Sequence, residues 1–383
     1  MASGSKTSII ILSYETLACT RLCIESIRSF TAPGTYDIIV VDNASTDGSL
    51  AYLRAQPDVH LIENRENRGF PAACNQGMAA AAAGSDLLLL NSDTIVTPHW
   101  LENLQRALGS DAAVGAVSCV TNQCSHFQQI PVQYEDIDAM IRFASSFNRS
   151  QPELWQPWQT LVGFCLLIRR AAYERIGGLD EAFSPGNYED DDYCLRLRDA
   201  GYTLLLCQDT FIHHFGSASF RKDEDPRRRA AKEARYAELL ARNERYLLKK
   251  HGLPADWNVL HGMVQHLPPE RLAAGQRVLV VGTAGGLDLY VLAAAHPGVQ
   301  LGGVTFDRRA AQRTRQDIAL AFAQASPAGI AAVIEGAYDT IVLLGSAPVE
   351  AEAAVDMLRG RLAPGGRAYF TDGERVFWQG EKE

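Results

Sequence analysis

Short apolar runs alternate with longer amphipathic stretches over the first 91 residues of the chain. The runs are rich in Ile, Val and Leu and are bounded by polar residues, which is typical of buried strands. Strands are expected at 8–13, 36–42, 59–63 and 86–91. Helices are expected through 16–30, from about 46, and through 71–83. Because strands joined by helical crossovers pair in parallel, this order predicts an α/β fold with a doubly wound parallel sheet.

The pattern changes in the middle of the chain. Residues 122–158 are rich in Gln, Ser, Asn and Pro and show no clear period, which indicates a lid, a binding loop or a disordered segment. A regular pattern then returns. It predicts a buried strand over 159–170, a short helix that ends at Gly177 and Gly178, a helix over 189–202, and an apolar run at 203–207.

The stretch from Arg221 to His251 predicts one long basic helix. Asp225 is placed to cap its start, and Gly252 with Pro254 would end it. The stretch holds eleven Lys or Arg against six Asp or Glu, whereas the whole chain carries a formal charge of −9. We interpret it as a solvated helix between two domains; contact with an anionic membrane surface or a phosphorylated acceptor is the alternative.

A second alternation of strands and helices follows the basic helix. Its strands are expected at 277–286, 301–307, 338–344 and 367–372, which predicts a second, smaller α/β unit. The chain is therefore expected to contain a first domain over 1–220, a helical linker over 221–274, and a second domain over 275–383.

Composition excludes several classes of protein. Of the 383 residues 47% are hydrophobic and 21% are charged, which excludes a disordered, collagenous or coiled-coil chain. No apolar stretch approaches membrane-spanning length and the N-terminal run is too short for a signal peptide, so a cytoplasmic location is expected. The eight cysteines show no CxxC spacing, which predicts reduced thiols. The acidic balance argues against nucleic-acid binding.

Polar residues follow three of the predicted strands, at the end where parallel sheets bind ligands. They are Ser13, Tyr14 and Glu15 after the first strand, Asp42 and Asn43 after the second, and Asn91, Ser92 and Asp93 after the fourth. Asp42 is a candidate acceptor of hydrogen bonds from a nucleotide base, with a capped turn as the alternative. Asp93 could hold the Mg²⁺ or Mn²⁺ of a metal–diphosphate complex.

Three further groups carry candidate chemistry. Asn67, Gly69 and Asn75 surround a helix start that suits a phosphate, although a plain loop and helix surface would look the same. The run of carboxylates Glu189, Asp190, Asp191 and Asp192 could supply a general base, or could simply favour the helix start. His213 and His214 would point to opposite faces of a strand, so that one of them could act as a second metal ligand.

Taken in order, these motifs resemble family 2 glycosyltransferases of the GT-A fold, in the rhamnosyltransferase-like branch. The resemblance covers about residues 6–220 and rests on the motifs VDNASTDGS, NRGFPAACNQG, NSD, GFCLLIRR, GGLDEAF, EDDDYCLRLRDAGY and HHFGSAS, with the opening strand before them.

The resemblance implies an inverting transfer of a sugar from a UDP- or dTDP-linked donor to a hydroxyl of a glycan, lipid-linked glycan or protein. Asp190 would be the catalytic base, and Glu189, Gly163 and Asp192 would border the acceptor. Asp93 and His214 would bind a divalent metal. Asn91 replaces the first acid of the family's Asp-x-Asp pattern.

The second unit resembles the front part of a Rossmann-like methyltransferase, through RVLVVGTAGG, Asp307 and RLAPGGRAYF. Ala284 and Val280 depart from that pattern, so S-adenosylmethionine is not expected and a role in interaction or homodimerisation is favoured. A bifunctional glycosyltransferase and methyltransferase, and a non-catalytic scaffold that binds nucleotide sugars, are the alternatives. A peripheral contact with the inner face of the membrane through 221–251 is a further expectation.

Overall fold

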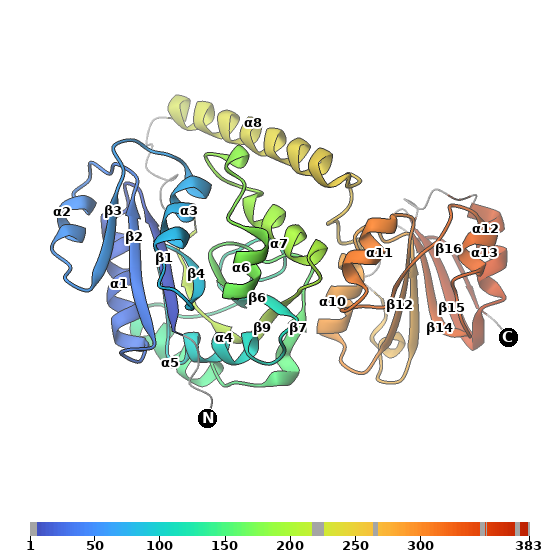
Figure 1. The fold of residues 1–383 in the computed structure, drawn as a ribbon. Coiled ribbons are helices and arrows are strands. Elements are labelled where there is room, and N and C mark those ends of the chain that lie inside the picture. The colour runs from blue at the N-terminus through green and yellow to red at the C-terminus, as the bar shows by residue number, and fades with distance from the viewer. Residues whose placement is uncertain are drawn as a thin grey trace. The chain divides into compact units, whose positions relative to one another are not determined.

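The computed structural model describes residues 6–216, 226–262, 267–344, 349, 351–371 and 376–381. The chain divides into two compact units, Met1–His251 and Gly252–Glu383. The sequence placed the end of the first domain near residue 220, so the division falls about thirty residues later, after the basic helix (Figure 1).

The first half of the N-terminal sheet is parallel, as the sequence predicted. Its strands are β1 (Thr7–Ser13), β2 (Tyr36–Asp42), β3 (Val59–Glu63) and β4 (Asp86–Asn91), in the spatial order β3-β2-β1-β4. The central residues of β1, β2 and β4 are almost fully buried because helices cover both faces of the sheet, whereas the edge strand β3 is partly exposed. The carboxyl ends of β1, β2 and β4 therefore meet at one edge.

The second half of this sheet is mixed, which the sequence did not predict. It continues through β8 (Cys165–Ile168), β6 (Val114–Val120), β9 (Thr203–Phe211) and β7 (Trp155–Pro157). β8 runs antiparallel to both β4 and β6. A strand buried on both faces is apolar throughout, so its pattern does not reveal its direction. A small second sheet pairs β5 (Thr94–Ile95) with β10 (His213–His214).

The N-terminal unit contains the helices that the sequence predicted and two that it did not, over Trp100–Leu108 and Ile137–Phe147. They are α1 (Leu17–Phe30), α2 (Ser49–Arg54), α3 (Phe70–Ala80), α4 (Trp100–Leu108), α5 (Ile137–Phe147), α6 (Arg170–Ile176) and α7 (Glu189–Asp199), with 3₁₀ turns at Pro152–Leu154 and Glu181–Phe183. The segment 122–158, which lacks a clear period, holds α5 and β7. Trp100 is fully buried, and its indole N–H donates to Thr31 Oγ1 at 3.0 Å.

The long basic helix α8 (Pro226–His251) packs on the N-terminal unit. The Asn243 side chain is 1% exposed, and its Nδ2 donates to three backbone carbonyls of the segment that leads into α7. These carbonyls belong to Phe183, Gly186 and Asn187. Leu247 is fully buried. The expected solvated linker is thus a packed helix over 226–251; the expected cap Asp225 lies outside the described residues.

The C-terminal unit contains its own sheet, in the order β13-β12-β11-β14-β15-β16. The strands are β11 (Arg277–Val281), β12 (Gln300–Thr305), β13 (Leu320–Phe322), β14 (Tyr338–Leu344), β15 (Leu362–Thr371) and β16 (Val376–Glu381). All pair in parallel except β16, which is antiparallel to β15. The helices are α10 (Leu287–Ala295), α11 (Arg308–Thr314), α12 (Pro327–Ala331) and α13 (Ala351–Arg359), with a 3₁₀ turn at Pro269–Arg271.

The parallel sheet agrees with a Rossmann-like arrangement but does not by itself identify a methyltransferase. Asp307, expected where a ribose-binding acid would sit, caps α11: its Oδ1 accepts from the backbone N–H groups of Arg309 and Ala310. Within the described ranges, no helix combines the length and the apolar character needed to cross a membrane. All eight cysteines are free and most are buried, which confirms the prediction of reduced thiols.

Candidate active site

Asp42, at the end of β2, presents a buried carboxylate to the edge of the sheet. Its side chain is 0% exposed, and Oδ2 accepts from the Ser45 N–H at 2.9 Å. Oδ1 is also buried and has no hydrogen-bond partner in the described part of the chain. A buried acceptor without a partner is costly, which suits an atom that receives a ligand's N–H or O–H.

Ser13, Tyr14 and Glu15 continue this edge from β1. Glu15 has a left-handed backbone, with φ of 55°, and its Oε1 accepts from the Thr46 N–H at 2.7 Å and the Thr46 hydroxyl at 2.9 Å. Ser13 is buried, whereas Tyr14 is 40% exposed. Glu15 therefore fastens the loop after β2 and leaves the Tyr14 ring beside it accessible.

Asn43 connects this edge to the start of α3. Its Nδ2 donates to Asn67 Oδ1 at 3.1 Å and to the carbonyl of Gly69 at 3.3 Å. Gly69 precedes α3 with φ of 81°, a conformation that favours glycine. Asn43, Asn67 and Gly69 therefore lie together, which joins two of the groups of candidate residues found in the sequence.

Asn75, on α3, bonds to a different segment of the chain. Its Nδ2 donates to the Leu179 carbonyl at 2.9 Å and to Glu181 Oε1 at 3.0 Å, and its Oδ1 accepts from the Leu179 N–H at 2.8 Å. These bonds tie α3 to the segment before α7. The structure thus gives Asn75 a tethering role, and its expected contact with the nucleotide sugar stays a prediction.

Asp93 and His214 are brought together by the pairing of β5 with β10. The distance from Asp93 Oδ1 to His214 Nε2 is 3.3 Å, and Asn91 Nδ2 lies 3.5 Å from the same ring nitrogen. Ser92 lies between Asn91 and Asp93 in the sequence, and its hydroxyl oxygen is 3.2 Å from that of Thr16. The two metal ligands expected from the sequence are therefore neighbours.

The surroundings of His214 determine which ring nitrogen faces Asp93. Nδ1 lies 2.9 Å from the carbonyl oxygen of Gln123, and an oxygen of this kind only accepts. Nδ1 therefore carries the proton, and in the neutral ring Nε2 presents a lone pair toward the carboxylate. Two acceptors at this distance suit a cation placed between them. The ring also stacks on Phe164, with centroids 5.3 Å apart.

The adjacent His213 points elsewhere. Its Nδ1 lies 2.6 Å from the Tyr134 hydroxyl, and burial together with the neighbouring His214 lowers its pKa to about 4. His213 is thus a neutral, packed ring, consistent with the expectation that only one of the pair faces the site.

The donor set fits a hard divalent cation held by few protein ligands. Within the described ranges, no cluster of three or more His, Cys, Asp or Glu side chains could hold a metal ion. Mg²⁺ characteristically binds one or two carboxylates and completes its shell with water and substrate phosphates. Asp93 and His214 offer such a partial shell, with the amide Asn91 in the place of a second acid.

Asp190 stands at the start of α7 with both carboxylate oxygens occupied by backbone N–H groups. Oδ2 accepts from Gly163 at 2.8 Å and Oδ1 from Asp191 at 3.0 Å. Burial and the charge of Asp191 raise its pKa to about 6. Burial and the charge of Asp190 also hold the pKa of Glu189 well above its usual range. A carboxylate that titrates near neutrality is suited to take a proton.

Two consecutive residues connect Asp190 with the Asp93–His214 pair. Gly163 donates to Asp190, while the carbonyl of Phe164 accepts from the Asn91 N–H at 2.8 Å and its ring stacks on His214. The candidate base and the candidate metal ligands therefore border one region at the edge of the sheet. A β-carbon on Gly163 would lie 3.4 Å from Asp190 Cβ, so this approach is close.

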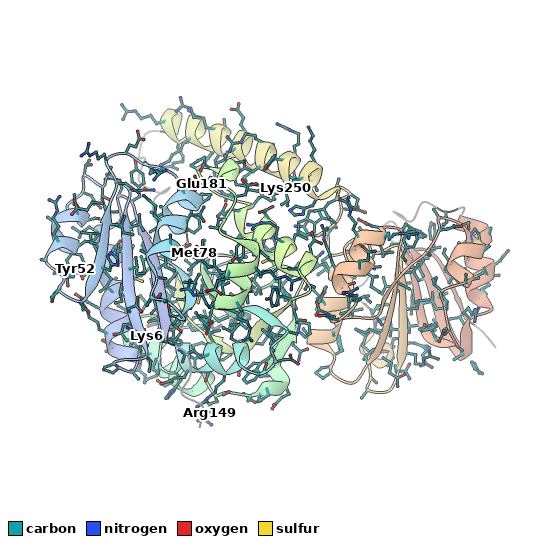
Figure 2. The ribbon with its side chains drawn as sticks, in the orientation of Figure 1. Lys6, Tyr52, Met78, Arg149, Glu181 and Lys250 are labelled. Carbon is teal, nitrogen blue, oxygen red and sulfur yellow. The ribbon has the colours of Figure 1, made fainter. Side chains whose placement is uncertain are left out.

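Asp192 does not face that region. It is 0% exposed and is surrounded by Lys250, His251 and Arg196, at 2.6, 2.8 and 2.8 Å. Burial raises its pKa, but hydrogen bonds from His251 and Lys250 outweigh burial and lower the pKa to about 2. The expected acceptor-side residue instead fastens α8 to α7; Lys250, on α8, is labelled in Figure 2.

The structure adds one residue that the sequence did not single out. His126, in the segment without a clear period, has its Nε2 3.3 Å from Asp191 Oδ1. No spacing or flanking motif indicates this contact, because it joins residues 65 positions apart in the chain.

The fold and the grouped side chains define an α/β unit that could bind a nucleotide and a cation at the strand ends. Residues 8–177 match the model of Glycosyl transferase family 2, the family that the sequence motifs resemble.

Individual relatives share this region. The O-antigen biosynthesis protein RfbC of Myxococcus xanthus is 28% identical over 236 residues, which are 58% of this chain and 18% of that protein. The N-acetylglucosaminyl-diphospho-decaprenol L-rhamnosyltransferase of Mycobacterium tuberculosis (strain H37Rv) is 25% identical over 215 residues, 49% of this chain and 68% of that protein. Two curated relatives are much longer, since the chain spans only 26% and 18% of their lengths.

Among solved structures, the mannosyltransferase PcManGT from Pyrobaculum calidifontis in complex with GDP-Man and Mn²⁺ is similar with a TM-score of 0.42 and 19% identity. The similarity covers 77% of this chain and 87% of that one.

Proposed function

We propose that residues 1–251 transfer a sugar, with inversion, from a nucleoside-diphosphate donor to a hydroxyl group of an acceptor. The observation that supports this proposal best is that the consecutive residues Gly163 and Phe164 contact Asp190 and His214, respectively. This arrangement sets a carboxylate that titrates near neutrality beside a carboxylate–imidazole pair suited to a cation.

Each residue has a defined task in the proposed reaction. Asp42 receives a hydrogen bond from the base of the nucleotide through its unpartnered Oδ1. Asp190 takes the proton of the acceptor hydroxyl, and the hydroxyl oxygen attacks the anomeric carbon opposite the leaving diphosphate. The Gly163 N–H bonded to Asp190 Oδ2 fixes the carboxylate for this transfer.

Asp93 and His214 would hold a divalent cation such as Mg²⁺ or Mn²⁺. When bound, it would supply positive charge to the diphosphate as negative charge develops there. Glu189 is buried beside Asp190 with Oε2 unpartnered within the described chain, which favours a contact with the acceptor. UDP- or dTDP-linked donors, a glycan, lipid-linked glycan or protein acceptor, a membrane contact of α8 and a homodimer stay predictions.

The test uses the purified full chain with Mg²⁺ or Mn²⁺ and a panel of UDP- and dTDP-linked sugars. Release of the nucleoside diphosphate is measured with water as acceptor and with candidate glycans. We expect Asp190→Asn to lower turnover by about 10²- to 10⁴-fold while the donor Kd stays within twofold, because a base acts mainly after binding.

Asp138→Asn is the matched control, since Asp138 is an exposed aspartate in the first turn of α5. It should turn over the donor like the unmodified protein. A fully active Asp190→Asn variant would remove Asp190 from the proposed role, and a protein that neither binds nor cleaves any donor would contradict the proposal as a whole.

A further inference from the structure

The loop that carries His126 is held firmly from both sides. Gln128 is 0% exposed: its Nε2 donates to Ser118 Oγ at 2.9 Å, and its Oε1 accepts from the Val162 N–H at 2.7 Å. The indole N–H of Trp158 donates to the carbonyl of His126 at 3.0 Å. The position of His126 is therefore set by the core of the N-terminal unit.

The backbone at this position is strained. His126 and Phe127 both have left-handed conformations, with φ of 57° and 59°. Non-glycine residues adopt this region at a cost, and strain of this kind concentrates at functional sites. The two residues also line a surface hollow of about 460 Å³, together with Cys124, Ser125, Gln129 and Pro131.

The strained backbone aims the His126 ring at α7. Nε2 lies 3.3 Å from Asp191 Oδ1, and Nδ1 lies 2.8 Å from the Ser125 hydroxyl. The Asp191 side chain is 5% exposed, so the pair is largely shielded from water. A shielded ion pair keeps most of its electrostatic effect on neighbouring groups.

The carboxylates at the start of α7 differ in their counter-charges. Asp192 is surrounded by cationic groups from α7 and α8, which leaves Glu189, Asp190 and Asp191 as a run of three acids. Among the described residues, the titratable groups that act on Asp190 come from α7 with its N-cap and from the loop. They are Tyr188, Glu189, Asp191 and Cys194 at α7, and Cys124 and His126 in the loop. His126 is the cationic group among them.

We propose that His126 is a positioning residue for the base of the transfer reaction, because its imidazolium holds Asp191 and offsets the negative charge that surrounds Asp190. This inference rests on the proposed function. Without His126 the three acids would lose the cation that lies beside them in the described part of the chain, and Asp190 would take up a proton more readily.

The titration behaviour agrees with this geometry. Burial lowers the pKa of His126, but the charge of Asp191 and the hydrogen bond to it outweigh burial and raise the pKa to about 9. His126 is therefore protonated at neutral pH. Its charge lowers the pKa of Asp190, against burial and Asp191, which together raise that pKa to about 6.

The test compares pH profiles of nucleoside-diphosphate release by the full chain and by His126→Gln, which keeps a polar side chain but loses the charge. Loss of one nearby opposite charge raises a carboxyl pKa by about one or more. Turnover of His126→Gln at pH 6, relative to its own turnover at pH 8, should therefore fall about fivefold below that of the unmodified protein. Asp191→Asn, which removes a negative charge beside Asp190, should move the profile toward lower pH.

The control is His99→Gln, since His99 is an exposed histidine that pairs with Glu102 on α4. Its profile should coincide with that of the unmodified protein. A His126→Gln profile that also coincides, or that is lowered equally at every pH, would overturn the inference, because a merely structural residue would have one of these effects.

A second measurement separates this inference from the proposed function. The titration of Asp190 is followed by ¹³C NMR of labelled aspartate carboxyls, with the signal assigned through Asp190→Asn. His126→Gln should raise the pKa of Asp190 by about one, whether or not a donor is turned over. If no donor is cleaved, the proposed function fails; if the Asp190 pKa is unchanged, the role of His126 fails.

Discussion

The contact between Asp192 and α8 supports a prediction about how this helix is held. Asp192→Asn removes the negative charge that Lys250, Arg196 and the His251 ring contact, and leaves all three beside a neutral amide. In the folded protein the Asp192 pKa is lowered from 3.8 to about 2. Because a tenfold change in an equilibrium corresponds to about 1.4 kcal/mol, the ionised form stabilises the packed state by about 2 kcal/mol.

The sign of this contribution follows from the lowered pKa. The stabilisation is fully present above pH 4, where Asp192 is charged in both states. It is lost as the pH falls through about 2, where the folded form also takes up the proton. At neutral pH, Asp192→Asn should therefore raise the population of locally opened α8 by about thirtyfold.

Peptide-level hydrogen exchange of the full chain measures this opening. The peptides of α8 should exchange about thirtyfold faster in Asp192→Asn, while those of β1 and β2, whose central residues are buried in the core, should be unchanged. The control is Asp199→Asn, which lies on α7 like Asp192. The Asp199 side chain is 48% exposed and lies 4.0 Å from His251, so this substitution should change the exchange of α8 little. Equal protection of α8 in Asp192→Asn and the unmodified chain would refute the reasoning.

Two further predictions follow from local geometry. Asp93→Ala should abolish the metal-dependent part of nucleotide-sugar binding, because the proposed cation would lose its carboxylate ligand. Titration calorimetry of the unmodified protein that found the same donor affinity with and without metal would contradict this. Gly77→Ala should lower the thermal unfolding temperature, because the new β-carbon would lie 2.3 Å from Ile10 Cγ2 and overpacking costs about 1–3 kcal/mol. An unchanged temperature in calorimetry would show that α3 and β1 separate without cost.

The sequence predicted the strands of the first half of the sheet well, with three of the four at their observed bounds. At 36–42, 59–63 and 86–91 a short apolar run is bounded by polar residues on both sides, so the period and the turn signals agree. It did not predict the antiparallel direction of β8, whose residues are buried on both faces. It also missed α5, because the polar residues of 122–158 obscure an amphipathic helix of eleven residues.

The sequence predicted the grouping of those candidate site residues that directly follow strands. Asp42, Asn43, Asn91 and Asp93 meet at one edge because neighbouring strands end there. The positions of Asn75 and Asp192 were not predicted, because their partners come from segments distant in the chain, Leu179 and the end of α8. Tertiary contacts of this kind leave no mark on local periodicity.

The last two residues of α8, Lys250 and His251, also bear on how such a chain can be recombined during evolution. Both contact the Asp192 carboxylate, and they stand directly before Gly252, where the second unit begins. An exchange of genes that joins a different C-terminal unit after His251 keeps these contacts. A junction at residue 220 would leave Asp192 buried with Arg196 as its remaining cation and would remove Asn243 from the three carbonyls it satisfies. Selection should therefore favour fusions that inherit α8 together with α7 and the segment before it.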